Sequence, residues 1–125
     1  MSTTRTLRAL ACALLLWSLA TGVAAQRAAA PAEPYQPTVG QPGKDVVWVP
    51  TPQVLVDTML AMAKLTPSDR LIDLGSGDGR TVVTAARRGA RALGLELNPD
   101  LVRLARQLAE REGVADRARF EQRDL

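Results

Sequence analysis

Hydrophobic and polar positions along residues 46–125 follow a pattern that predicts helices separated by short strands. Apolar residues recur at helical spacing before Lys64 and again between Leu101 and Leu108. Residues 71–74 instead form a short apolar run before a glycine-rich loop, which is typical of a strand buried on both faces of a parallel sheet. The predicted order is helix 52–64, strand 71–74, helix 81–88, strand 91–97, helix 99–112 and strand 119–122.

Residues that begin and end helices support these boundaries. Thr51 followed by Pro52 is typical of an N-cap and a first helical turn, and Asn98 is expected to cap the third helix. Residues 66–69 end the first helix in a turn, and Gly89 ends the second. Strands that alternate with helices predict an α/β domain with a doubly wound, Rossmann-like parallel sheet.

The N-terminal segment has the layout of a secretory signal. A basic start at Arg5 and Arg8 precedes an apolar core at residues 10–20, and small residues follow before Gln26. Residues 1–25 are therefore expected to be cleaved, which makes the protein periplasmic or secreted. An uncleaved anchor at residues 7–24 remains the alternative, although its core is short of the roughly 20 residues that a membrane-spanning helix needs.

A linker is expected to follow the signal. Residues 26–45 are rich in Pro, Gly, Ala and Gln, and their prolines are spaced so that neither a helix nor a central strand continues through them. The folded domain is therefore predicted to occupy residues 46–125. Within it, Trp48 lies in a short apolar run and is predicted to belong to the core, with stacking on a cofactor or shielding of a substrate channel as the alternative.

Charge, cysteine and histidine content exclude several classes of function. The chain has 16 basic and 13 acidic residues, and because Arg5 and Arg8 lie in the signal, the remainder carries 14 against 13, or +1. Such a balance disfavours a nucleic-acid-binding face. The single cysteine, Cys12, lies in the signal, and there is no histidine. A cysteine metal site, a disulfide and a histidine-based hydrolase are therefore not expected.

The strongest chemical signal is a glycine-rich segment that leaves the first strand and opens a helix. It reads Asp73-Leu74-Gly75-Ser76-Gly77-Asp78-Gly79-Arg80. Glycines let the backbone take conformations that a Cβ forbids, and the free N–H groups of the helix favour a carboxylate or a phosphate. A dinucleotide-binding loop needs a glycine or a small residue where this chain has Arg80, so a nucleotide of that type fits poorly.

Acidic residues stand at the ends of all three predicted strands. Glu96 ends the second, where its carboxylate can accept hydrogen bonds from both hydroxyls of a ribose. Dinucleotide enzymes also use an acid there, so Glu96 alone does not discriminate between ligands. Asp124 closes the third strand, and Asp73 lies in the first. Three acids at one edge of a parallel sheet strengthen the prediction of a ligand site.

These motifs resemble those of class I S-adenosylmethionine-dependent methyltransferases, in which an acid precedes three glycines at alternate positions. The resemblance extends to the mitochondrial-type protein-lysine methyltransferases that modify the ATP synthase c subunit and the adenine nucleotide translocase. The segments that carry it are residues 49–52, 73–80 and 94–98, with Phe120, Asp124 and Leu125.

The resemblance implies a role for each matched residue. Asp73 with Gly75, Ser76, Gly77 and Gly79 would hold the methionine part of S-adenosylmethionine, Glu96 its ribose, and Asp124 its adenine, with Pro50 and Thr51 over the site. Asn98 would also bind the cofactor. The implied acceptor is a lysine amine of a protein. No catalytic residue, metal or nucleic-acid partner is predicted, and the oligomeric state and the number of methyl groups stay open.

Two other interpretations remain at this point. An exported protein would leave the compartment in which S-adenosylmethionine is made, so the domain is alternatively a nucleoside-binding module or a truncated, non-catalytic product. The chain contains only the first three strands of the implied sheet. We therefore expect an incomplete fold whose 71–74 strand lies at an open edge, which would make the isolated chain poorly soluble.

Overall fold

The computed structural model describes residues 33–43, 45 and 47–124, and Pro34–Leu125 form one compact unit. The predicted signal peptide and the alternative anchor at residues 7–24 lie outside the described residues. Among the residues that are described, no helix is long and apolar enough to cross a membrane.

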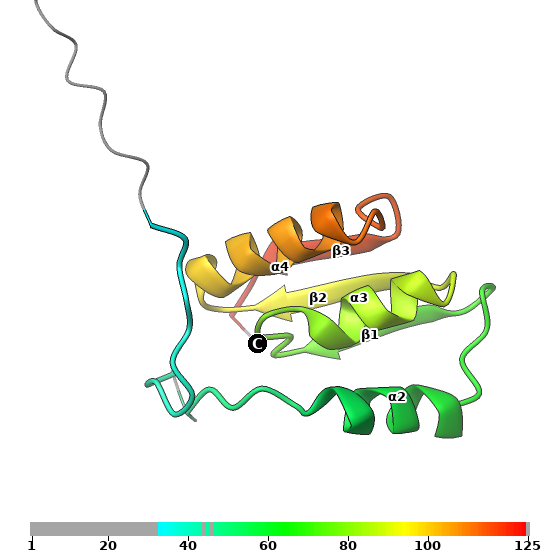
Figure 1. The fold of residues 1–125 in the computed structure, drawn as a ribbon, viewed down its shortest axis with the longest axis horizontal. Coiled ribbons are helices and arrows are strands. Elements are labelled where there is room, and N and C mark those ends of the chain that lie inside the picture. The colour runs from blue at the N-terminus through cyan, green and yellow to red at the C-terminus, as the bar shows by residue number, and fades with distance from the viewer. Residues whose placement is uncertain (1–32, 44, 46, 125) are drawn as a thin grey trace, which may run out of the picture. The chain divides into compact units, whose positions relative to one another are not determined.

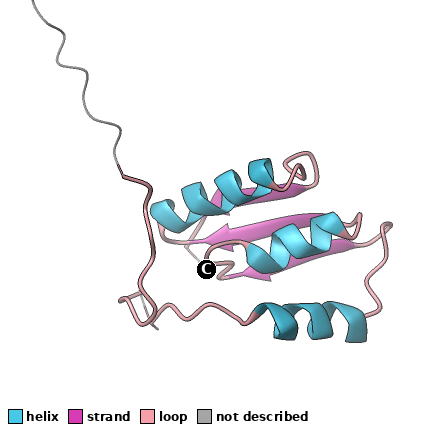
Figure 2. Cartoon of the chain, in the orientation of Figure 1, coloured by secondary structure: helices cyan, strands magenta, loops and turns pink. Residues whose placement is uncertain are grey.

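Helices and strands alternate along this unit, as Figures 1 and 2 show. The three strands are parallel and lie in the order β1-β2-β3, with β1 at an edge. The predicted α/β class, the three strands and the edge position of the first strand are therefore confirmed. The elements are α2 (Gln53–Met62), β1 (Arg70–Leu74), α3 (Arg80–Arg87), β2 (Arg91–Glu96), α4 (Pro99–Arg111) and β3 (Ala118–Gln122).

The register of the strands brings the chemically interesting residues to one edge of the sheet. Asp73 lies opposite Gly94, which in turn lies opposite Phe120. Glu96 pairs with Gln122, two residues before Asp124. Because parallel strands all end at the same edge, the glycine loop, Glu96 and Asp124 follow strands that end side by side.

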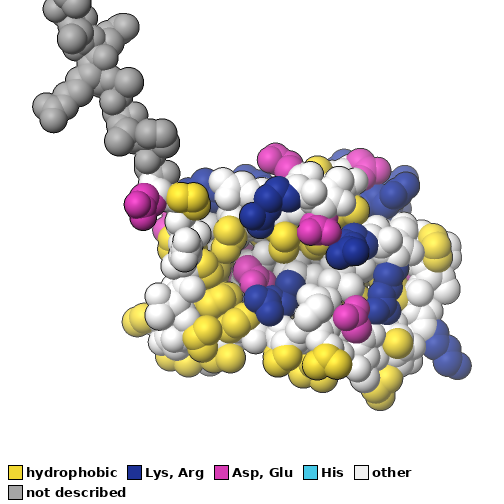
Figure 3. Space-filling model, viewed as in Figure 1, with side chains coloured by type: hydrophobic (Ala, Val, Ile, Leu, Met, Phe, Trp, Pro, Cys, Tyr) yellow, Lys and Arg dark blue, Asp and Glu magenta, His cyan; other side chains and the backbone are white. Residues whose placement is uncertain are grey.

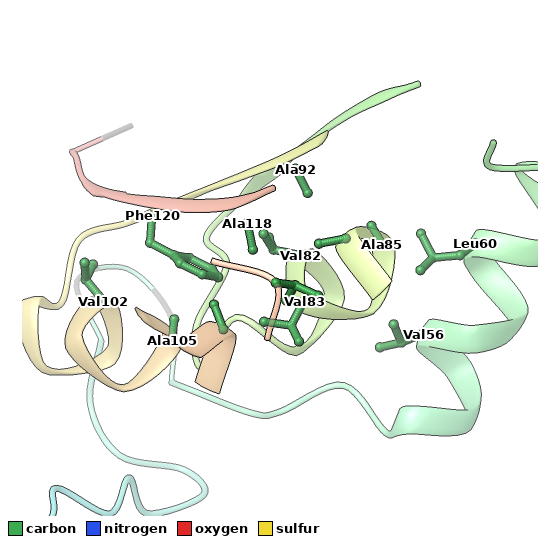
Figure 4. Close-up of a cluster of buried hydrophobic side chains, with 13 residues drawn as sticks. Val56, Leu60, Val82, Val83, Ala85, Ala92, Val102, Ala105, Ala118 and Phe120 are labelled. Atoms are coloured by element: carbon green, nitrogen blue, oxygen red, sulfur yellow. The ribbon is translucent and has the colours of Figure 1, made fainter. Parts of the chain in front are cut away.

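The core lies between the sheet and one layer of helices. Helices α3 and α4 cover the same face of the sheet, and α2 packs against α3 (Figure 1). Figure 4 shows Val56 and Leu60 pointing from α2 towards α3, while Phe120 reaches from β3 towards α4. The buried cluster consists of Val56, Leu60, Val82, Val83, Ala85, Ala86, Ala92, Val102, Ala105, Ala109, Val114, Ala118 and Phe120.

The expectation that the first strand is buried on both faces is wrong for the described part of the chain. Leu71 and Asp73 face α3, but Ile72 and Leu74 are 64% and 65% exposed on the opposite face. The reason is that both sheet-packing helices lie on one side, so nothing in the described residues covers the other. The apolar residues of β1 thus lie on both of its faces, and only the face towards α3 is covered here.

The start of α2 also differs from the prediction, since Thr51 does not cap the helix. Pro52 occupies the N-cap position and makes no side-chain capping bond. The Thr51 carbonyl instead accepts a hydrogen bond of 2.9 Å from Arg80 Nη1 at the start of α3. The predicted cap on α4 is confirmed, because Asn98 Oδ1 accepts the N–H of Asp100 at 2.9 Å.

The outer side of α2 is apolar and exposed. Hydrophobic side chains gather along the lower edge of Figure 3, over this helix. They include Val54, Met59 and Met62, of which Met62 is 78% exposed. Only one stripe of α2, with Val56 and Leu60, reaches the core.

Gly79, the N-cap residue of α3, lies directly against α4 and β3. A Cβ on this residue would lie 2.6 Å from the Ala105 Cβ and 2.7 and 2.8 Å from two ring atoms of Phe120. Its φ of 82° is also one that residues with a Cβ rarely adopt. The third glycine of the loop therefore serves the packing of helix on sheet.

We predict that Gly79→Ala destabilises the domain more than Gly113→Ala does. Both glycines have positive φ, so both substitutions share a backbone cost of about 1–2 kcal/mol. A Cβ on Gly113 meets no atom within 4 Å, whereas overlap at Gly79 should add about 1–3 kcal/mol. Urea unfolding of the two variants measures the difference, and equal losses would show that the packing at Gly79 relaxes freely.

Candidate functional site

The glycine loop is bound to β2 rather than to the strand it leaves. The N–H groups of Gly75 and Ser76 both donate to the carbonyl of Leu95, at 2.8 and 2.9 Å. The Gly79 N–H donates to the Ser76 carbonyl at 2.9 Å, which closes the turn. The loop is therefore held at the carboxyl end of β2, where Glu96 follows.

The close approach of loop and strand depends on Gly94. A Cβ there would lie 2.6 Å from Ser76 Oγ and 2.7 Å from Phe120 Cδ1. Ser76 is consequently buried between the loop and β2, and its Oγ has no hydrogen-bond partner among the described residues. The absence of a side chain on Gly94 is thus what lets the loop lie directly against β2.

The Glu96 carboxylate links the loop to the start of α4. Its Oε2 accepts the N–H of Gly77 at 2.9 Å, and its Oε1 accepts the N–H of Asn98 at 2.9 Å. Each carboxylate oxygen has two lone pairs, so one acceptor position on each oxygen remains for a ligand. Glu96 can hold the loop in place and still accept a pair of hydroxyl groups.

Asp73 lies behind the loop in a half-buried position. Burial raises the pKa of its carboxyl above the ordinary value of 3.8, and the nearby negative charge of Glu96 raises it as well. A hydrogen bond with the Thr81 side chain acts in the opposite direction. Two like charges are thus held near each other, an arrangement that disfavours folding and that is common at functional sites.

A cavity of about 380 Å³ opens at this edge of the sheet, within the range of roughly 300–1,000 Å³ typical of ligand pockets. Its walls come from the segment before α2, from the ends of β1 and β2, from α4 and from the residues after β3. They are Gln41, Pro42, Gly43, Asp45, Val47, Trp48, Val49, Leu74, Gly75, Glu96, Leu97, Asn98, Leu101, Arg123 and Asp124.

The predicted site residues divide into two groups around this cavity. Gly75, Glu96, Asn98 and Asp124 line it. The remaining four are not in its wall: Asp73 lies behind the loop, and the loop itself contains Ser76, Gly77 and Gly79. Pro50 and Thr51, expected over the site, are not in the wall either. Which of these residues touches a ligand remains a prediction.

Several cavity residues escaped the sequence prediction. The most prominent is Trp48, which was expected in the core but is half-buried and lines the cavity. Gln41 and Pro42 belong to the segment interpreted as a linker, and its Pro- and Gly-rich composition gave no sign of a site. The only available signal was an aromatic residue just before the 49–52 motif.

Comparisons with known proteins agree with this geometry. Residues 73–125 match the ANTKMT methyltransferase domain. A protein-lysine N-methyltransferase of Saccharolobus islandicus is 43% identical over 75 residues, which cover 58% of this chain and 47% of that protein. A lysine N-methyltransferase of the ATP synthase c subunit, from Xenopus laevis, is 44% identical over 78 residues, or 62% of this chain and 34% of that protein.

A solved structure extends the agreement to three dimensions. An RNA methyltransferase from Salinibacter ruber in complex with S-adenosyl-L-homocysteine superposes with a TM-score of 0.60 and 55% identity, over 61% of this chain and 50% of that one. The fold is that of a class I methyltransferase. The chain spans about half the length of the Saccharolobus relative that it matches.

The resemblance predicted from the motifs is therefore confirmed, both for class I methyltransferases and for the lysine methyltransferases within them. The matched region begins at Asp73 and includes Gly94, Glu96 and Asp124. The glycine loop, Glu96 and Asp124 thus lie inside the matched region, whereas the cavity residues between Gln41 and Val49 precede it.

We predict that Asp73→Asn stabilises the folded domain at neutral pH. Because the folded state of the wild type holds the Asp73 proton more tightly than the unfolded chain, its free energy of unfolding falls as the pH rises from 3.8 through the raised pKa. The variant lacks this titration. The free energy of unfolding of Asp73→Asn, relative to that of the wild type, should therefore increase from pH 3.8 through the raised pKa of Asp73 and stay constant at higher pH.

Denaturant unfolding between pH 3 and pH 8 measures this difference. The exposed Asp116, replaced by Asn, provides the control for the loss of one surface carboxylate. An Asp73→Asn variant that is less stable than the wild type at pH 7 would contradict the prediction and show that the Asp73 charge stabilises the loop.

Proposed function

We propose that this protein is an S-adenosylmethionine-dependent methyltransferase that methylates a lysine amine of a protein. The observation that carries the proposal is the Glu96 carboxylate, which is bound to the glycine loop and faces a cavity at the carboxyl edge of a class I methyltransferase sheet. The shared domain and the named lysine methyltransferases among the relatives support it.

The residues present fit this cofactor. Glu96 keeps one free acceptor position on each oxygen, as a ribose diol requires. Gly75 is exposed at the cavity, and a Cβ built on it would meet no atom within 4 Å, so space is open directly above its backbone. The apolar part of the cavity wall includes Leu74, Leu97 and Leu101. Asp124 is placed beyond β3, where it would receive the adenine amine.

When bound, S-adenosylmethionine supplies a methyl group on a positively charged sulfur. The chain's own contribution is to hold this group in one orientation and to keep water from the reacting atoms. Glu96 and the loop provide the orientation. The acceptor lysine must lose its proton, and an apolar environment favours its neutral form by lowering its pKa. No histidine is needed for that step.

The choice of acceptor rests on the relatives. Two of the relatives are named as lysine N-methyltransferases, whereas the solved structure is named as an RNA methyltransferase. The near balance of 14 basic and 13 acidic residues after position 25 favours a protein acceptor, since RNA binding needs clustered basic residues. RNA therefore serves as the contrasting substrate in the test.

Export of the protein is a further part of the proposal. The basic start, apolar core and small residues of the first 25 positions support a cleaved signal and a periplasmic or secreted location. The intact mass of the protein recovered from its native cells tests this, because cleavage removes residues 1–25. Recovery of the uncleaved chain from the membrane fraction would instead indicate the anchor at residues 7–24.

Calorimetric titration with S-adenosylmethionine is expected to show binding that Asp73→Asn and Glu96→Gln both weaken. Glu96→Gln replaces one acceptor oxygen by an NH₂ group that faces a backbone N–H. Loss of one hydrogen bond to a charged group costs about 1.5–3 kcal/mol, so the affinity should fall about tenfold or more. Glu110→Gln, on the exposed side of α4, is the matched control.

Radiolabelled methyl transfer into protein or RNA from the same cells then tests the acceptor. Label in lysine supports the proposal, and label in RNA alone would replace the acceptor by RNA. A folded wild-type chain that binds no S-adenosylmethionine would overturn the enzyme assignment and favour a non-catalytic domain.

A further inference from the structure

Residues 35–49 form a strap that folds back on itself beside the cavity; positions 44 and 46 of this strap lie outside the described residues. Its two arms pair through the backbone. The Gly40 N–H donates to the Trp48 carbonyl at 2.8 Å, and the Trp48 N–H donates to the Gln41 carbonyl at 2.9 Å. Both main-chain polar groups of Trp48 are thereby held by the opposite arm.

The side chain of Gln41 holds the turn of the strap together. Its Nε2 donates to Tyr35 Oη at 2.8 Å, and its Oε1 accepts the N–H of Thr38 at 2.9 Å. The Gln41 N–H also donates to the Thr38 carbonyl at 2.9 Å. The side chain of Gln41 therefore joins Tyr35 to Thr38, while its backbone carbonyl accepts the Trp48 N–H.

The indole of Trp48 rests on the glycine loop. A Cβ on Gly77 would lie 2.7 Å from Trp48 Nε1 and 3.4 Å from Cδ1, so the ring occupies space that only a glycine leaves free. Gly77 is also the residue whose N–H donates to Glu96. The ring is thus placed beside the contact that holds the loop, in the wall of the same cavity as Gly75 and Glu96.

Burial argues against a purely structural role for this tryptophan. Val47 and Val49 on either side of it are 56% and 63% exposed, and Trp48 itself is only half-buried. The strap is therefore ordered by polar contacts and by the indole rather than by a hydrophobic core of its own. An aromatic ring that is fixed in a cavity wall has little rotational freedom left to lose when a ligand packs against it.

We propose that Trp48 contacts the bound cofactor and that Gln41 is a positioning residue which holds Trp48 against the glycine loop. This inference rests on the proposed function, because the strap forms one wall of the cavity in which S-adenosylmethionine is proposed to bind. A flat apolar ring buries a large area of ligand at little entropic cost, so Trp48 should contribute much of the affinity.

Tryptophan fluorescence with S-adenosyl-L-homocysteine as the probe tests the proposal. The chain has two tryptophans, so Trp17→Phe in the full chain leaves Trp48 as the sole reporter. Its emission should change with the ligand and saturate at the dissociation constant found by calorimetry. Trp48→Ala should weaken binding about tenfold or more, and Trp48→Phe, which keeps a ring, by only about threefold.

Two further variants separate positioning from general damage. Gln41→Ala should weaken binding about threefold to tenfold and reduce the emission change, while circular dichroism stays that of the wild type. Met62→Ala, on the exposed side of α2, is the control and should bind like the wild type.

Either of two results would overturn the inference while leaving the proposed function intact. One is calorimetric binding by the wild type with no change in Trp48 emission at saturation. The other is a folded Trp48→Ala variant whose affinity equals that of Met62→Ala. A wild-type chain that does not bind the probe at all would overturn the proposed function together with this inference.

Discussion

The Glu96 carboxylate connects the three segments from which the candidate site is built. It ends β2, accepts the N–H of Gly77 from the loop after β1, and accepts the N–H of Asn98 at the start of α4. The loop is further held by two N–H groups on the Leu95 carbonyl, one residue earlier. Because one acid holds both the loop and the start of the helix, the geometry of the cavity depends on this residue.

The same arrangement creates an electrostatic conflict. Asp73 lies half-buried beneath the loop, and its pKa is raised by burial and by the charge of Glu96. A fold selected for stability alone would not place two carboxylates in this way. Their proximity is understandable if a ligand with several hydrogen-bond donors binds between the loop and β2.

Close packing explains why the glycines of this region have separate tasks. Each glycine lacks the Cβ that would overlap a neighbouring side chain. Gly79 leaves space for Ala105 and Phe120, Gly94 for Ser76 and Phe120, and Gly77 for the indole of Trp48. Phe120 therefore contacts both the loop and β2 from the third strand. The loop conformation is supported from several directions, so the site is built on the core and not merely attached to it.

The sequence by itself determined the order of helices and strands, the parallel α/β class and the location of the loop, since these follow from the spacing of apolar residues and from local glycine and cap chemistry. Only the tertiary structure decided that Pro52 and not Thr51 begins α2, that one face of β1 is exposed, and that Trp48 lies in the cavity wall. Each of these depends on contacts between residues far apart in the chain, such as Arg80 with Thr51 or Trp48 with Gly77. Local sequence patterns do not predict such contacts, because the same apolar run can lie in a core, at a sheet edge or in a pocket wall. Its environment depends on residues that are distant in the sequence.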